Sequence, residues 1–108
     1  MDPEVAFALY RPQDGKEREL LRLIGDHLPT LRRLELITDR PPLLLRSLDG
    51  TYVEIFEWRS GRAARVAHEH PEVAAVWEAM GEVADFRALA DLEESKAQFC
   101  HFTPVPVD

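Results

Sequence analysis

The chain has 108 residues, of which 45% are hydrophobic and 31% are charged, and it carries a formal net charge of −7 at pH 7. Its length suits a single domain spanning residues 1–108 with one core, and its apolar content excludes a disordered chain. The net negative charge makes nucleic acids and anionic membranes unfavourable partners, because both repel an acidic surface.

The sparse use of cysteine bears on compartment and chemistry. Cys100 is the single cysteine, so no internal disulfide can form, and this suits the reducing cytoplasm. The sequence shows neither the spacing of a metal site nor a glycine-rich phosphate loop, so no cofactor is expected. The apolar stretch at residues 5–10 is too short for a signal peptide or a membrane span. We therefore expect a cytoplasmic protein.

The first predicted elements are a strand and a helix. Residues 5–10 read VAFALY, an apolar run of strand length. Pro29 is expected to interrupt the following helix, because proline lacks the N–H of a helical hydrogen bond. Apolar residues at helical spacing predict that this helix covers residues 16–28, with a buried stripe formed by Leu20, Ile24 and Leu28.

A β-hairpin is predicted next. The Asp-Gly pair at residues 49–50 favours a tight type I′ turn and lies between the apolar stretches 43–48 and 51–58. A two-residue turn places Leu44 opposite Ile55. Side chains alternate between the faces of a strand, so one face is expected to carry Leu44, Val53 and Ile55, and the other Tyr52, Glu54, Phe56 and Trp58.

Two further helices and a last strand complete the prediction. Ser60 is placed to cap a helix over residues 61–69, and Pro71 suits the first turn of a following helix. Residues 97–102 read AQFCHF and are expected to form the last strand. The order of elements predicts the α+β class, with a ferredoxin-like βαββαβ fold and an antiparallel sheet.

The predicted strands carry apolar side chains on both faces. An antiparallel sheet with one face in water alternates apolar and polar residues instead, and the run at residues 5–10 does not. Because the helices can cover one face only, we expect a second copy of the sheet to cover the other in a homodimer. The alternative is that the strands are short enough for this pattern to be accidental.

A longer signature follows the hairpin. The stretch Tyr52-Val-Glu-Ile-Phe-Glu-Trp58 is followed by Ser60 and, on the next predicted helix, by Ala67-His68. This pattern resembles the antibiotic biosynthesis monooxygenase-like domains of the dimeric α+β barrel superfamily, and the likeness extends over most of the chain. The resemblance implies a ferredoxin-like chain that pairs into a dimeric barrel and binds a small molecule. It also implies that the face with Glu54, Phe56 and Trp58 looks toward the helices, whereas the face with Leu44 looks into the dimer.

The resemblance and the residue chemistry together indicate candidate site residues. His68 is the first catalytic candidate, because a histidine can give or take a proton near neutral pH and the family places one here. Glu54 is the second, because a carboxylate among aromatic side chains is desolvated, which favours a role as a general base. The expected wall of the substrate pocket consists of four aromatic residues, Tyr52, Phe56, Trp58 and Trp77.

Each catalytic candidate also has a structural interpretation. His68 lies near a helix end, where histidines commonly make surface contacts, and Glu54 can pair with Arg46 or Arg65. The family commonly has a carboxylate two residues before the tryptophan, where this chain has Phe56. The haem-degrading members of the superfamily carry a triad of Asn, Trp and His. Because this chain contains no asparagine, haem degradation is not expected.

Three hypotheses for function follow from these features. The first is a monooxygenase-like domain that binds a small apolar or aromatic molecule, with cofactor-free oxidation of a quinol or aromatic compound as the candidate reaction. The second is a non-catalytic dimeric binding or stress-response module. The third is a structural relative whose own side chains fill the pocket. An open cavity lined by His68 favours the first, and a filled core around Trp58 favours the third.

Overall fold

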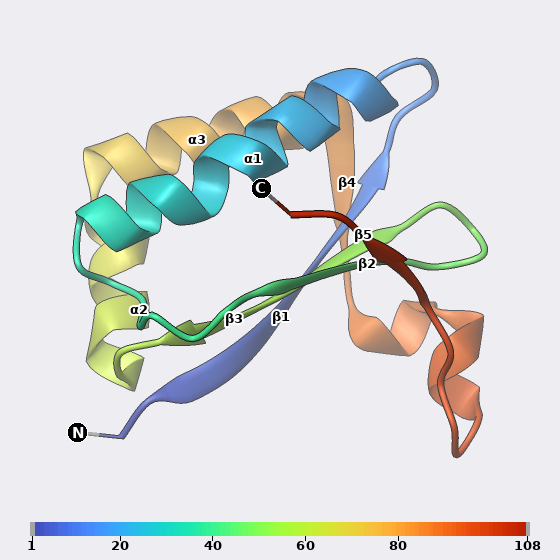
Figure 1. The fold of residues 1–108 in the computed structure, drawn as a ribbon. Helices are drawn as coiled ribbons and strands as arrows, with labels where there is room; N and C mark the ends of the chain where they lie inside the picture. Colours follow the sequence, from blue (N-terminus) through green and yellow to red (C-terminus); the bar gives the residue numbers. More distant parts are fainter. Residues whose placement is uncertain (1, 108) are drawn as a thin grey trace.

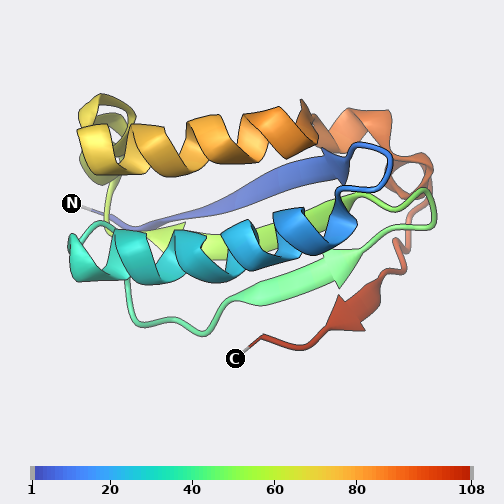
Figure 2. The same ribbon diagram turned by 90° about the horizontal axis from the view of Figure 1, so that it is seen from above.

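The computed structural model describes residues 2–107 as two layers, a five-stranded antiparallel sheet with helices packed on one face (Figure 1). The helices α1 and α3 run side by side across that face (Figure 2). The elements in chain order are β1 (Glu4–Pro12), α1 (Glu17–Arg33), β2 (Leu43–Arg46), β3 (Tyr52–Trp58), α2 (Gly61–Glu69), α3 (Pro71–Val83), β4 (Ala84–Arg87), the short 3₁₀ turns η1 (Leu89–Asp91) and η2 (Glu93–Lys96), and β5 (Thr103–Val105).

The strand order confirms the predicted fold class. The strands lie in the order β4-β1-β3-β2-β5, with β1 and β3 at the centre. The first four strands have the ferredoxin-like arrangement, in which each half of the chain contributes one central and one outer strand. The fifth strand, β5, adds to the outer edge of β2.

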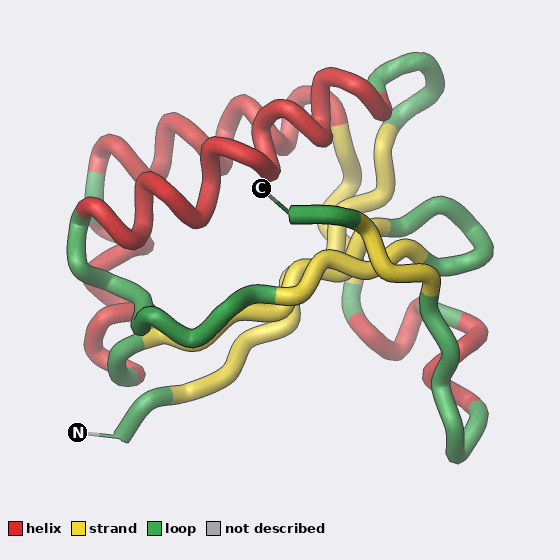
Figure 3. The backbone as a smooth tube through the Cα atoms, in the orientation of Figure 1, coloured by secondary structure: helices red, strands yellow, loops and turns green. Residues whose placement is uncertain are grey.

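The last strand of the predicted fold was misplaced. Residues 97–102 form no strand (Figure 3), and the fourth strand is instead β4, which follows α3 directly and pairs with residues 9–12 of β1. Four residues are too few to show an alternating pattern, so their pairing with β1 decides their structure. Pro104 lies in β5 at the edge of the sheet, where its missing N–H does not remove a hydrogen bond between strands.

The expected break at Pro29 was also wrong. Helix α1 continues through this residue to Arg33. Pro29 and Gly25 both lie on the exposed side of the helix, so water can reach the Gly25 carbonyl group that loses its helical partner. The next carbonyl group, that of Asp26, accepts a hydrogen bond from the Thr30 hydroxyl at 2.8 Å.

The hairpin is present, but its turn is longer than predicted. The Gly50 N–H donates to the Ser47 carbonyl oxygen at 3.1 Å, and Gly50 has a φ of +94°. A type I′ turn needs positive φ at both central residues, and within this turn only the glycine has it. The register shifts by one residue, so Leu44 lies opposite Glu54 rather than Ile55. Leu44 therefore faces the helices, which corrects the face predicted for it.

The other local predictions agree with the structure. The Ser60 side chain accepts a hydrogen bond from the Ala63 N–H at the start of α2. Pro71 begins α3, and the His70 side chain caps that helix by accepting from the Glu72 N–H. These residues fix the two helix starts that follow β3.

The face of the sheet away from α1 and α3 is partly covered by the chain itself. Residues 88–102 pass across one end of it (Figure 1), and Leu92 is buried there against Leu9 and Val53. The expectation that the chain has nothing of its own to cover this face was therefore wrong for that end. At the other end, three apolar side chains are 51% to 56% exposed: Val5, Phe7 and Leu43. Among the described residues, no helix is both long and apolar enough to cross a membrane.

Candidate functional site

Glu54 and His27 form a buried pair between the sheet and α1. Each residue is only 2% exposed, and the His27 Nδ1 atom lies 2.8 Å from Oε1 of Glu54. The hydroxyl group of Tyr10 in β1 donates to the same carboxylate oxygen at 2.8 Å. A buried carboxylate is costly unless hydrogen bonds compensate for lost water, and here two partners meet one oxygen.

Trp77 of α3 extends this network. Its indole Nε1–H donates to Nε2 of His27 at 2.9 Å. The network, which consists of Tyr10, Glu54, His27 and Trp77, thus joins β1, β3, α1 and α3. Its members lie far apart in sequence, so the packing of the helices on the sheet brings them together.

The local sequence explains how these side chains come to point inward. Tyr10 alternates with Ala6 and Ala8 on the helix-facing side of β1, and the two alanines are too small to fill the space above them. His27 continues the buried stripe of α1, together with Leu20, Ile24 and Leu31. A histidine in such a stripe needs hydrogen-bond partners from the neighbouring layer.

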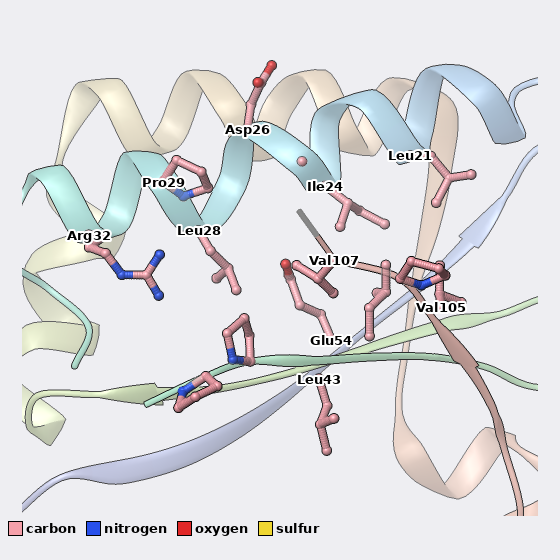
Figure 4. Close-up of a pocket in the computed structure, with 15 residues that line it drawn as sticks. Leu21, Ile24, Asp26, Leu28, Pro29, Arg32, Leu43, Glu54, Val105 and Val107 are labelled. Atoms are coloured by element: carbon pink, nitrogen blue, oxygen red, sulfur yellow. The ribbon is translucent and has the colours of Figure 1, made fainter. Parts of the chain in front are cut away.

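A cavity lies between α1 and the β2–β5 edge of the sheet, and we call it the α1–β5 pocket. Its volume is about 680 Å³, which is in the range of small-molecule sites. Figure 4 shows Glu54 extending from β3 toward α1 at the bottom of this pocket, whereas Asp26 points away. Most of the wall is apolar and is formed by residues that include Leu21, Ile24, Leu28, Leu44, Val105 and Val107.

A second cavity, which we call the β1–α3 cleft, opens on the other side of the buried pair. It measures about 330 Å³ and is lined by His27 but not by Glu54. His68 is exposed at this cleft, and the centroid of its ring lies 4.8 Å from the centroid of the Trp77 ring. The buried pair therefore separates two cavities, with Glu54 at one and His27 at the other.

Burial and charge act strongly on the Tyr10 phenol. Burial is the largest cause that raises the pKa of Tyr10 well above its usual value, and the charge and hydrogen bond of Glu54 raise it further. Tyr10 therefore stays protonated at neutral pH and serves Glu54 as a hydrogen-bond donor.

The comparison with solved structures found a protein of similar fold. No protein-family model matches the chain. No curated protein matches it either. Among solved structures, tetracenomycin F2 cyclase from Streptomyces glaucescens, a type II polyketide cyclase, aligns with 95% of this chain and 99% of its own, at a TM-score of 0.55 and 22% identity. The two chains share one fold. The match confirms, for the fold, the resemblance inferred from the sequence.

The predicted site residues are divided between the two cavities. Glu54 lines the α1–β5 pocket, whereas Phe56, Trp58, His68 and Trp77 line the β1–α3 cleft. Phe56 and Trp58 do face the helices, as predicted, and both are buried in the core. Trp58 is thus packed in the core and also borders the β1–α3 cleft, whereas the wall of the α1–β5 pocket contains neither Trp58 nor His68.

Tyr52 lies at neither cavity. Its hydroxyl group donates to Glu17 of α1 at 2.6 Å, and Arg46 lies 3.5 Å from the same carboxylate. The expected pairing of Glu54 with an arginine was wrong, because Arg46 binds Glu17 and the partners of Glu54 are Tyr10 and His27.

Sequence reasoning missed Tyr10 and His27 as site residues. No site role was expected for His27, which lies late in its helix. The available signal was its position three residues after Ile24 and four before Leu31, which places it on the apolar stripe. Tyr10 gave a weaker signal, because its hydroxyl is the one polar side-chain group of the apolar run at residues 5–10. In the part of the chain that the structure describes, no three His, Cys, Asp or Glu side chains gather in a way that could hold a metal ion.

Proposed function

We propose that the protein is an acid–base enzyme that binds a small, mostly apolar aromatic or polyketone molecule in the α1–β5 pocket, where Glu54 takes a proton from it. One observation carries this proposal, namely a carboxylate 2% exposed at the bottom of an otherwise apolar pocket of about 680 Å³. Such a pocket orients an apolar ligand by shape and leaves proton transfer to the polar group it contains.

The hydrogen bonds of Glu54 support this role. The contacts from Tyr10 and His27 both end on Oε1, which leaves Oε2 as the oxygen available to a ligand. The two partners hold the carboxylate in one rotamer, so the base is positioned before the ligand binds. The surrounding apolar wall excludes water that would otherwise compete for the carboxylate.

Ring closure is the reaction that this arrangement suits best. The protein with the shared fold is a polyketide cyclase by name, and ring closure of a polyketone needs a base rather than an oxidant. In such a step Glu54 takes a proton from a carbon next to a carbonyl group. That carbon then attacks a second carbonyl carbon to form the new C–C bond. The oxygen of that carbonyl becomes a hydroxyl group by receiving the proton from Glu54.

The predicted oxidation of a quinol or aromatic compound begins with the same proton transfer and is our second candidate. Its support is the resemblance around Trp58 and His68, residues that line the β1–α3 cleft rather than the pocket of Glu54. Because His68 and Glu54 line different cavities, we propose Glu54 as the proton acceptor and assign His68 a contact role in the cleft. The non-catalytic alternative keeps the same pocket and lacks turnover.

The proposed assembly is a homodimer that buries the remaining exposed end of the sheet. Three apolar side chains, Val5, Phe7 and Leu43, are more than half exposed on that face. Apolar groups gathered on one face of a strand pair favour association with a second copy, and two-fold pairing is the commonest symmetry.

Glu54→Gln tests the proposed chemistry, because glutamine keeps the shape of the side chain and cannot take a proton. We expect aromatic polyketone and hydroxyanthrone probes to bind with little change, measured by tryptophan fluorescence, while turnover falls by about a hundredfold or more. Glu57→Gln is the matched control, because Glu57 contacts Thr38 and Arg40 outside both cavities. Unchanged turnover in Glu54→Gln would contradict the proposal, and oxygen uptake during turnover would favour oxidation over ring closure.

A further inference from the structure

We infer that Trp77 is a positioning residue that fixes the tautomer of His27, with the ring hydrogen on Nδ1 and directed at Glu54. The inference rests on the proposed role of Glu54. It adds how the protein fixes the tautomer of His27, the hydrogen-bond partner of that carboxylate. Trp77 itself contacts His27, through a hydrogen bond of 2.9 Å, and acts on the site only through that ring.

The donor and acceptor roles follow from the chemistry of the two rings. An indole N–H can only donate a hydrogen bond, so Nε2 of His27 must accept and carries a lone pair. A neutral imidazole then carries its hydrogen on the other nitrogen, Nδ1, which lies 2.8 Å from Glu54. A ring hydrogen on Nε2 would face the Trp77 hydrogen directly. Because His27 is 2% exposed, water has little access to relieve such a clash.

This arrangement makes the buried network able to hold a proton but unable to conduct one. A proton taken up by Glu54 cannot pass into His27, since Nδ1 already carries a hydrogen and Nε2 is blocked by Trp77. Tyr10 is also a donor to Glu54 and offers no second route. The proton therefore stays on Glu54 until the ligand takes it back, which is what ring closure requires.

The groups that face His27 come from every element packed around it. Glu54 on β3 and Tyr10 on β1 contact it from the sheet, and Trp77 contacts it from α3. His68 on α2 and Arg87 on β4 line the same cleft, and both are cationic or can become so. Of these groups only Glu54 and Trp77 hydrogen-bond to the ring, so they determine which ring nitrogen carries the hydrogen.

Nitrogen NMR of the histidine rings tests the inference in the native protein without any ligand. We expect His27 to show a protonated Nδ1 and a bare Nε2. His70 is the internal reference, because its Nδ1 accepts from the Glu72 N–H and its neutral ring must carry hydrogen on Nε2. A native His27 ring with hydrogen on Nε2 would overturn the inference.

Trp77→Phe removes the donor and keeps an aromatic ring in the cleft. We expect the His27 spectrum to change in this variant, because Nε2 no longer accepts from an indole N–H and the ring hydrogen is free to occupy either nitrogen. Trp58→Phe is the matched control, because it shortens an indole of the same cleft and should leave the His27 spectrum unchanged. An unchanged spectrum in Trp77→Phe would overturn the inference. Should that variant not fold, the native spectrum alone decides the tautomer.

Kinetic measurements distinguish this inference from the proposed function. With any substrate found for the Glu54 test, Trp77→Phe should lower kcat by about tenfold or more and change its pH profile, with a smaller effect on KM. An altered spectrum with unaltered kcat would overturn the positioning role while leaving Glu54 as the base. Full turnover in Glu54→Gln would instead remove the proposed function and leave the tautomer assignment standing.

Discussion

At the scale of single residues, the buried carboxylate of Glu54 decides the properties of its neighbours. Two hydrogen bonds from distant parts of the chain meet its Oε1 atom, and the carboxylate adjoins an apolar pocket. The free energy lost by burying such a group is recovered only while both partners remain in place. Tyr10 and His27 are therefore part of the site, although neither belongs to the signature recognised in the sequence.

The tyrosines give a prediction for the effect of alkaline pH. Burial first, and then Glu54, raises the pKa of Tyr10. Burial first, and then Glu17, raises the pKa of Tyr52. A group whose pKa is raised by folding contributes stability below its unfolded pKa, about 10 for tyrosine, and that contribution is lost as the pH rises toward the folded value. The free energy of unfolding should therefore fall above about pH 10.

Denaturant titrations at a series of pH values, read with phenolate absorbance, measure this loss. Tyr10→Phe should flatten the alkaline decline, because one of the two tyrosines in the chain no longer titrates. The variant should also be less stable at neutral pH, since Glu54 loses a buried donor, at a cost of about 1–3 kcal/mol. If the phenolate of Tyr10 formed in the folded native protein near the usual tyrosine pKa of about 10, Tyr10 would not be enclosed as described.

At the scale of elements, α1 forms one wall of the pocket and also carries His27 to the buried pair. Gly25 lies on this wall, and no atom lies within 4 Å of the position that its Cβ would take. The sequence reasoning had ended the helix at Pro29, yet the same element continues to Arg33 and lengthens the wall.

Gly25→Phe should fill the pocket without disturbing the fold. We expect the melting temperature to stay within a few degrees of the native value and the affinity for aromatic polyketone probes to fall about tenfold or more. Gly25→Ala is the control: it should bind the probes as the native chain does and raise the free energy of unfolding by about 0.5–1 kcal/mol, because alanine favours a helix. Undiminished binding in Gly25→Phe would move the ligand to the β1–α3 cleft.

At the scale of the whole molecule, the far face of the sheet is shared between the chain and its proposed second copy. The segment that carries Leu92 covers one end, and the exposed apolar side chains lie at the other. We expect sedimentation at micromolar concentration to show a dimer. Phe7→Glu should yield a monomer, because a charge at a buried interface lacks a partner. Leu48→Glu, at a turn residue that is 95% exposed, should leave the dimer intact. A monomeric native protein would contradict the assembly.

The sequence by itself determined the features that depend on local patterns. Apolar runs of strand length predicted β1 and, with the Asp-Gly turn, the hairpin strands. Helical periodicity predicted the helices, and Ser60 and Pro71 marked two helix starts, because these signals act within a few residues. The ferredoxin-like order was predicted with a last strand at residues 97–102, whose place β4 takes in the structure. The inward direction of Glu54, Phe56 and Trp58 came from the family resemblance.

Only the tertiary structure decided the features that depend on distant partners. Four-residue β4 exists because β1 offers it an edge, and the face of Leu44 depends on a turn one residue longer than the pattern predicted. Hydrogen bonds within the site join side chains up to 50 positions apart, as Trp77 and His27 are. Their meeting depends on how α1 and α3 pack over the sheet, and no local pattern carries that information, because packing selects among all the surfaces the elements present.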